Sequence, residues 1–285
     1  MKVRLFARFM EAVLLATVLA GCGSRPPAIN AAAAFAQASM QRGANAYVHG
    51  DLSGARHEYI RALNVYESLD DVKGRASALL NLSRIASQSG DGTAALAAVG
   101  KVLAEPSSLD SATLITAHGR AAAIYLVQGD TATADRQLAS ASVLCSAACP
   151  DAGALTVLRA RSALAQQQPA AALQLTGQAL AMPTLSVSSP PTLKPQASAE
   201  RANALRLQAQ AQLALQQPVA ALAAASEALQ LDRALGLAER VLLDLRLISQ
   251  AHAAAGAIDS AMHYQLLADR AESAGKALRD NAQAN

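Results

Sequence analysis

The chain has 285 residues, of which 52% are hydrophobic, 3% are aromatic and none is tryptophan. Alanine and leucine, the strongest helix formers, supply most of the apolar residues, so the composition predicts an all-α protein and gives little support for strands. The formal net charge is +3; without Lys2, Arg4, Arg8 and Glu11 the chain keeps 21 basic and 20 acidic residues, and so small an excess argues against a nucleic-acid partner.

Residues 1–21 have the pattern of a secretory signal peptide. Basic residues near the start are followed by an apolar run over 12–20, which is too short to span a membrane as a helix. The run ends in Leu19-Ala20-Gly21-Cys22, which resembles the lipobox of bacterial lipoproteins. The resemblance implies that Cys22 carries a diacylglycerol, becomes the first residue of the mature chain and anchors it in a lipid bilayer. An ordinary signal peptide with a coincidental cysteine is the alternative.

The residues after Cys22 bear on location. Gly23 and Ser24 stand where an aspartate would signal retention in the inner membrane. The lipoprotein resemblance therefore implies the outer membrane, facing the periplasm, in an organism with two membranes. Residues 22–34, which include Pro26-Pro27, are predicted to be the lipidated cysteine and its tether.

A turn pattern recurs about every 40 residues in the rest of the chain. The six turns begin at Gly50, Gly90, Gly129, Gln167, Gln216 and Gly256, and an alanine follows each turn five residues later, at Ala55, Ala95, Ala134, Ala172, Ala221 and Ala261. Where the turn is Gly-Asp, glycine suits the left-handed end of one helix and aspartate can cap the next. The small side chain predicts close packing of two helices at each repeat.

These helix–turn–helix units, with small residues before the turn at Gly43, Ser83, Ala122 and Ala160, resemble the tetratricopeptide repeat family. Two features depart from that family: no copy has a bulky aromatic early in its first helix, and the period is near 40 rather than 34 residues. The resemblance implies a right-handed solenoid of about six helical hairpins. We expect hairpins 1–4 at 35–181, a Pro/Ser-rich loop at 182–197, and hairpins 5–6 with a C-terminal capping helix at 198–285, the cap falling at 269–279.

Cys145 and Cys149 are the remaining thiols, and in an oxidising compartment we expect them to form a disulfide, with free thiols as the alternative. A spacing of four residues is tight on a regular helix, and Pro150 suggests that the helix is already ending there. No two histidines have the spacing of a helical metal site, and no phosphate-binding loop or nucleophile motif occurs. We therefore predict no metal, no cofactor and no enzymatic activity.

In the tetratricopeptide family the first helix of each hairpin lines a concave groove. The candidate groove residues share repeat slots in pairs, Arg206 with Arg246, Arg84 with Arg161 and Asn81 with Arg120, and Tyr47 is a further candidate on that side. The resemblance implies a basic groove that holds an acidic or C-terminal peptide segment. The alternative is an ordinary solvated helix face with arginines paired to glutamates, and a Tyr47 that packs in the core.

Together these features predict a membrane-anchored periplasmic scaffold or adaptor that binds a partner protein or peptide. One alternative is an assembly factor of the pilotin type for an outer-membrane secretin or pilus system. Another is a purely structural subunit of the envelope.

Overall fold

The structure is a computed structural model that describes residues 30–145, 149–182 and 195–284, with side chains up to 277. Within these ranges it is all-α, without strands, as predicted. The first three hairpins are α2 (Ala31–Val48) with α3 (Leu52–Ser68), α4 (Val72–Gln88) with α5 (Gly92–Leu103), and α6 (Ser111–Gln128) with α7 (Thr131–Leu144). The other three are α8 (Ala152–Ala165) with α9 (Pro169–Ala181), α10 (Pro195–Ala214) with α11 (Pro218–Ala234), and α12 (Ala238–Ala254) with α13 (Ile258–Ala284). A short 3-10 helix, η1 (Pro106–Ser108), lies between α5 and α6.

The predicted Gly-Asp turns are confirmed. Gly50, Gly90 and Gly129 have φ of +80°, +81° and +81°, which is the left-handed conformation that ends a helix. The aspartate after each glycine caps the following helix, its carboxylate accepting a hydrogen bond from the amide of Gly54, Ala94 or Thr133. Each turn therefore stops one helix and starts the next within a few residues.

The fourth and fifth hairpins make the same turn with glutamine. Gln167 and Gln216 have φ of +59° and +58°, a conformation that is strained for a residue with a side chain. Here Pro169 and Pro218 begin α9 and α11, where proline's fixed φ suits the first helical position. The turn geometry is thus kept by two different sets of residues.

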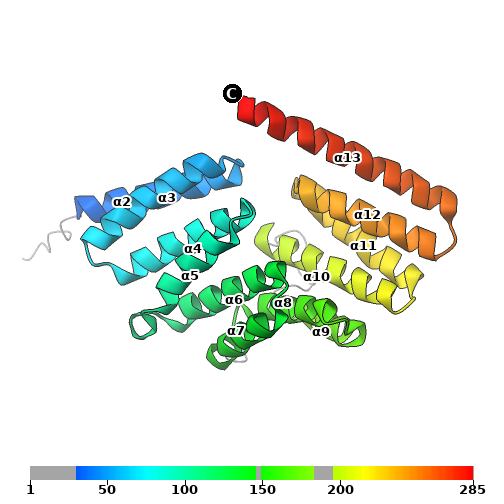
Figure 1. The fold of residues 1–285 in the computed structure, drawn as a ribbon, viewed down its shortest axis with the longest axis horizontal. Helices are drawn as coiled ribbons and strands as arrows, with labels where there is room; N and C mark the ends of the chain where they lie inside the picture. Colours follow the sequence, from blue (N-terminus) through cyan, green and yellow to red (C-terminus); the bar gives the residue numbers. More distant parts are fainter. Residues whose placement is uncertain (1–29, 146–148, 183–194, 285) are drawn as a thin grey trace, which may run out of the picture.

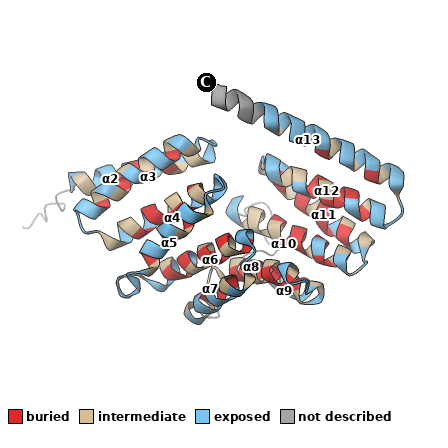
Figure 2. Ribbon diagram, viewed as in Figure 1, coloured by how far each residue is buried: buried red, intermediate tan, exposed pale blue. Residues whose placement is uncertain are grey.

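The recurring alanine packs as predicted, between the two helices of each hairpin. Ala55, Ala95, Ala134, Ala172 and Ala221 are completely buried, and Ala261 is 8% exposed. Buried residues lie along the helix faces that meet other helices, while the outer faces are exposed (Figure 2). The core is accordingly a chain of local clusters, each shared by neighbouring hairpins, as in solenoid proteins.

The hairpins lie side by side along an arc, running from α2 through α6–α9 to α13 (Figure 1). Each second helix packs against the first helix of the next hairpin. From α4 to α12, the first helices also contact one another: α4 meets α6, α6 meets α8, α8 meets α10, and α10 meets α12. They form one continuous layer, and we call the surface of α2, α4, α6, α8, α10 and α12 the first-helix face.

Three boundaries differ from the sequence expectation. α2 begins at Ala31, four residues early, because the Asn30 side chain accepts hydrogen bonds from the amides of Ala32 and Ala33. α10 begins at Pro195, so the end of the expected 182–197 loop is helical. The predicted cap at 269–279 is not a separate helix: α13 continues through it as one helix of 27 residues.

Candidate partner-binding face

Tyr47 and Arg84 meet on the first-helix face. Tyr47 is in the last turn of α2 and is half-buried, and Arg84 is an exposed residue of α4. The Cζ atom of Arg84 lies 4.2 Å from the centroid of the Tyr47 ring, a cation–π contact. Tyr47 also packs against the buried cluster of Ala55, Tyr59 and Ile85, so the expected core packing of this residue is found together with its contact to the guanidinium.

Arg120 lies on α6, within electrostatic reach of Arg84. The residue is half-buried, and its Nε–H, which has no accessible surface, has no hydrogen-bond partner among the described residues. Burial lowers the pKa of Arg120 to about 10, and the like charge of Arg84 acts in the same direction. The two arginines are thus close, and neither forms an ion pair with a carboxylate of the described residues.

Arg161 continues this set on α8. Burial lowers its pKa, and no carboxylate or other oxygen partner of its side chain is found in the part of the chain that the structure describes. Asn81, one turn before Arg84 on α4, is engaged locally, since its Nδ2 donates to the Ser77 carbonyl at 3.0 Å. The structure therefore places arginines without a carboxylate partner among the described residues on three successive first helices, with Asn81 three residues before the first of them.

Arg206 does not have the exposure expected of a groove residue, and the prediction that it lines the groove is wrong. Its side chain is 7% exposed and lies between α10, α11 and α12. It donates to Asp244 through Nε at 2.6 Å and to Asp232 through Nη2. Both carboxylates are completely buried, so this guanidinium belongs to a buried ionic cluster.

Arg246 is exposed but already paired. Its Nη2 donates to Glu272 Oε2 on α13 at 2.8 Å, with the two side chains 40% and 53% exposed. Such a surface pair contributes at most about 1 kcal/mol to stability. Arg246 therefore fits the alternative of a solvated face with paired glutamates.

Sequence reasoning missed the partners of Arg206, although a signal was present. Arg206 and Asp232 are 26 residues apart, as are Arg246 and Glu272. The equal spacing confirms that the two arginines share a slot, from which each reaches the second helix of its own hairpin. Asp244 lies on α12, the first helix of the hairpin that follows Arg206. Arg246 itself lies on α12, and no further hairpin is described that could give it an equivalent carboxylate.

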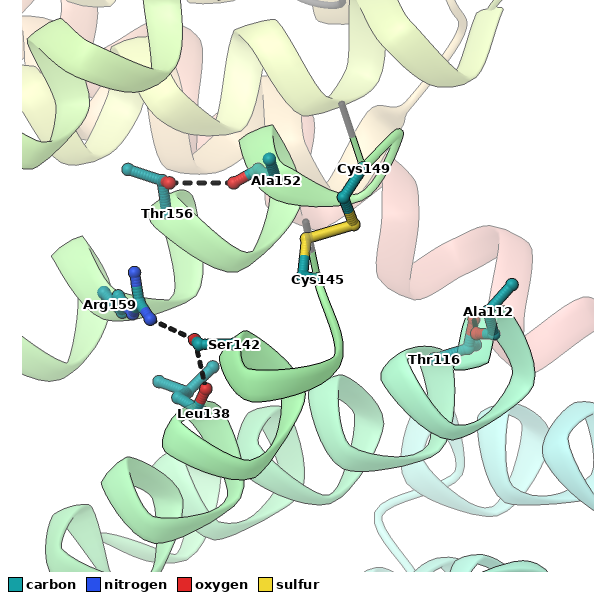
Figure 3. Close-up of a disulfide and its surroundings, with 9 residues drawn as sticks. All are labelled: Ala112, Thr116, Leu138, Ser142, Cys145, Cys149, Ala152, Thr156 and Arg159. Atoms are coloured by element: carbon teal, nitrogen blue, oxygen red, sulfur yellow. Dashed lines mark hydrogen bonds between the residues drawn. A yellow bond between two sulfur atoms is a disulfide. The ribbon is translucent and has the colours of Figure 1, made fainter. Parts of the chain in front are cut away.

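Cys145 and Cys149 are joined in a disulfide with a Cα–Cα distance of 5.2 Å (Figure 3). α7 ends at Leu144, Cys145 has an extended backbone, and α8 begins only at Ala152. Because both cysteines lie outside regular helix, the spacing of four residues is compatible with disulfide geometry. The bridge therefore links the end of the third hairpin to the start of the fourth.

Other kinds of site find little support in the described ranges. No group of three His, Cys, Asp or Glu side chains is placed to hold a metal there. A cleft between α3, α4 and α5 is crossed by an ion pair of Arg75 and Glu105 at 2.8 Å, and none of the predicted groove residues lines it. No helix among residues 30–284 that the structure describes is long and apolar enough to cross a membrane. The predicted lipidation site, Cys22, lies outside the described residues.

The arrangement defines a class: an array of helical hairpins with a continuous layer of first helices. Solved structures share it. A thermophilic TPR protein of Thermus thermophilus has 19% identity and a TM-score of 0.52, covering 73% of this chain and 99% of its own. BtubC (BKLC) from P. vanneervenii has 14% identity and a TM-score of 0.57, covering 84% and 92%. TPR-like repeats from Podosopora anserina have 19% identity and a TM-score of 0.51, covering 71% and 96%.

The chain therefore has the tetratricopeptide repeat fold, in agreement with the resemblance seen in its sequence. No family model matches the sequence, and no curated protein matches it either. The likeness accordingly concerns the fold.

Proposed function

We propose that this chain is a membrane-anchored scaffold that holds a partner protein or peptide against its first-helix face, without catalysing a reaction. The observation that carries the proposal is the set of arginines on α4, α6 and α8 for which the described chain provides no carboxylate. Charged residues at a protein surface steer and select partners through complementary charge. A solenoid face of several helices offers room for an extended segment of another chain.

The anchor in this proposal is Cys22, in the bilayer of the outer membrane, with the hairpins in the periplasm. The support is the lipobox-like Leu19-Ala20-Gly21-Cys22 and the absence of an aspartate after it. Metabolic labelling with a fatty acid analogue, followed by membrane fractionation, tests this step. We expect label and outer-membrane recovery for the full chain and neither for Cys22→Ala. Label that persists in Cys22→Ala would refute the anchor and leave the scaffold to be tested separately.

The scaffold itself is tested by affinity capture from envelope extract with mass spectrometry, using the full chain. We expect one stoichiometric envelope protein. Its capture should fall when Arg84, Arg120 and Arg161 are replaced together by alanine. The matched control is Arg246→Ala, which removes an arginine that is already paired. A chain that captures nothing, and that purifies only as an obligate oligomer, would instead be a structural subunit of the envelope.

A further inference from the structure

One face of the first hairpin has no neighbour. From the second hairpin on, each first helix packs against the second helix of the preceding hairpin. α2 has no preceding hairpin among the described residues, and it lies at one end of the arc (Figure 1). The side of this hairpin that points away from the second hairpin is therefore uncovered within the part of the chain that the structure describes. We call it the end face, and it carries Phe35, Arg42, Glu58 and Arg61.

The repeat register places Arg42 on the end face. Arg42 lies eight residues before Gly50, the glycine of its turn. The equivalent residues of the third and sixth hairpins, Ala121 and Ile248, are buried in clusters shared with the preceding hairpin. Arg42 thus occupies a slot that elsewhere packs against another helix, yet its own side chain is 47% exposed.

Phe35 lies on the same face, between two guanidiniums. The Cζ atoms of Arg61 and Arg42 lie 4.9 Å and 5.9 Å from the centroid of its ring, and the residue is 40% exposed. Glu58 lies between the two arginines and accepts from Arg42 Nε and from Arg61 Nη1, each at 3.0 Å. Two guanidiniums and one carboxylate leave this cluster with a net positive charge. The Arg61 Nε–H and Nη2–H groups have no acceptor among the described residues.

A polar cap alone would not require the phenylalanine. The terminal hairpin of a solenoid needs a polar outer face, and the arginines with Glu58 provide one. Phe35, however, is the only phenylalanine after residue 21, and it is on the surface instead of in the core. An exposed aromatic ring beside arginines suits a membrane–water interface, because the ring enters the apolar edge of the bilayer while guanidiniums bind lipid phosphates.

The position of the anchor decides which surface the end face meets. Cys22 and Asn30 are eight residues apart, so the start of α2 lies no more than about 29 Å from the expected lipidated residue. That limit is close to the length of α2 itself, whose 18 residues span about 27 Å. At so short a range the bilayer has a high effective concentration, and even a weak surface contact is populated. A partner protein has no such advantage at this face.

We infer that the end face docks on the phospholipid headgroups of the bilayer in which Cys22 is anchored. Phe35 enters the interface, and Arg42 and Arg61 donate hydrogen bonds to lipid phosphates. This inference rests on the proposed function, because it needs the lipid on Cys22. It adds a fixed orientation of the hairpins relative to the membrane, which a short tether alone does not impose.

The chain contains no tryptophan, so a tryptophan at position 35 is a unique reporter. The acylated Phe35→Trp chain is reconstituted into vesicles of phosphatidylethanolamine and phosphatidylglycerol whose acyl chains carry bromine, a short-range quencher of indole fluorescence. We expect quenching and a blue shift, because apolar faces at membrane surfaces reach about 5–10 Å into the headgroup–acyl boundary. The matched reporter is Val219→Trp, at a 77% exposed position of α11 in the fifth hairpin, and it should show neither effect.

The arginines are tested in the Phe35→Trp chain. Arg42→Gln and Arg61→Gln together should abolish the quenching, since the contacts to phosphate are lost. Both arginines form only exposed ion pairs, so this variant should fold, and its melting temperature verifies that it does. The matched control is Arg56→Gln on α3, which should leave the quenching unchanged. Arg56 lies six residues after the glycine of its turn, and the equivalent Asp135 contacts the following hairpin instead of the preceding one.

Four results would overturn the inference while leaving the anchor intact. One is a vesicle-bound chain whose indole at position 35 stays open to aqueous iodide and is not quenched by the brominated lipid. Another is equal quenching at positions 35 and 219, which would mean that the chain has no fixed orientation. A third is an indole already shielded from iodide in the unacylated Cys22→Ala chain, because the segment between Cys22 and Asn30 would then cover the face. The fourth is loss of quenching on addition of inorganic phosphate, which would assign the arginines to a soluble anion.

Failure of the anchor has a different signature. A chain that carries no acyl group and stays off the vesicles would refute the anchor, and this inference with it. The scaffold would still be tested by capture of a partner, which depends on the first-helix face and not on the end face.

Discussion

The buried cluster of Arg206, Asp232 and Asp244 predicts that the last two hairpins lose stability as the pH rises from about 4 to about 6. The Arg206 guanidinium forms ion pairs with both carboxylates, and all three side chains have little or no exposure to water. Asp232 Oδ1 has no hydrogen-bond partner among the described residues. Burial raises the pKa of Asp244 to about 6, against the opposing effect of Arg206, and the charge of Asp232 adds to the rise. The folded state therefore holds a proton that the unfolded chain releases near its usual pKa of 3.8.

The magnitude follows from that difference in proton affinity. A group whose pKa is raised on folding contributes stability at acidic pH that is lost as the pH passes through the folded pKa. The difference of roughly two pH units corresponds to about 3 kcal/mol of unfolding free energy, lost between pH 4 and 6, with no further loss above. The loss should be confined to α10–α12, because solenoid stability is local.

Replacing Asp232 by Asn removes one of the two negative charges and retains an acceptor for Arg206. We expect the variant to be more stable than wild type at pH 7.5 and similar to it at pH 4.5. Urea unfolding at both pH values, with amide hydrogen exchange to locate the change in α10–α12, measures this. The variant is compared with wild type because the lowered pKa values of Glu58, Asp110 and Asp130 make the stability of the folded chain increase with pH. This contribution is common to both proteins and cancels in the difference.

The control is Glu272→Gln, which breaks the equivalent but exposed pair with Arg246. It should change stability by at most about 1 kcal/mol at either pH. If Asp232→Asn destabilised the protein equally at pH 4.5 and 7.5, the cluster would not carry an excess proton, and the reasoning would be refuted.

Three further predictions concern the fold. Gln167→Gly should stabilise the protein by about 0.5–1 kcal/mol in thermal unfolding. Glycine removes the steric strain of the left-handed backbone, and this gain exceeds the cost of a more flexible unfolded chain. Gly90→Gln should have the opposite effect. Ala134→Leu should destabilise it by about 1–3 kcal/mol in urea, since this completely buried slot has no room for three more carbons; equal stability would mean that α6 and α7 can separate freely. Replacing Cys145 and Cys149 by serine should lower stability by about 2 kcal/mol, the effect of closing a very short loop, and reduction of the wild type should give the same loss.

The fold was predictable because its determinants are local and repeated. A Gly-Asp turn specifies both a left-handed helix end and a cap, and the alanine five residues later specifies close packing. These signals do not depend on contacts distant in sequence. The length of α13 was less predictable, since the polar stretch at 269–279 is compatible both with a separate cap and with a longer helix.

The candidate site was only partly predictable, because a shared repeat slot does not determine whether an arginine is free. Arg206 and Arg246 occupy equivalent positions, yet one is buried between two aspartates and the other is on the surface. The difference comes from Asp244, which belongs to the following hairpin. Nothing in the local sequence around Arg206 reports that neighbour, and the contact between Arg84 and Tyr47 likewise joins different hairpins.

Arg206 and Arg246 each pair with an acidic residue 26 positions later, so this spacing can be searched for in the sequence. Arg84 shows where such a search fails. Arg120 and Arg161 have Ser146 and Val187 at that spacing, so the search predicts no acid partner for either. Arg84 has Asp110 there, but Asp110 caps α6 by accepting from the Thr113 amide at 2.8 Å. α5 has only 12 residues, so position 110 falls beyond the second helix instead of on it. Arg84 also lies six residues before its turn, whereas Arg206 and Arg246 lie ten residues before theirs, so the spacing is a guide only for residues that share the slot of Arg206 and Arg246.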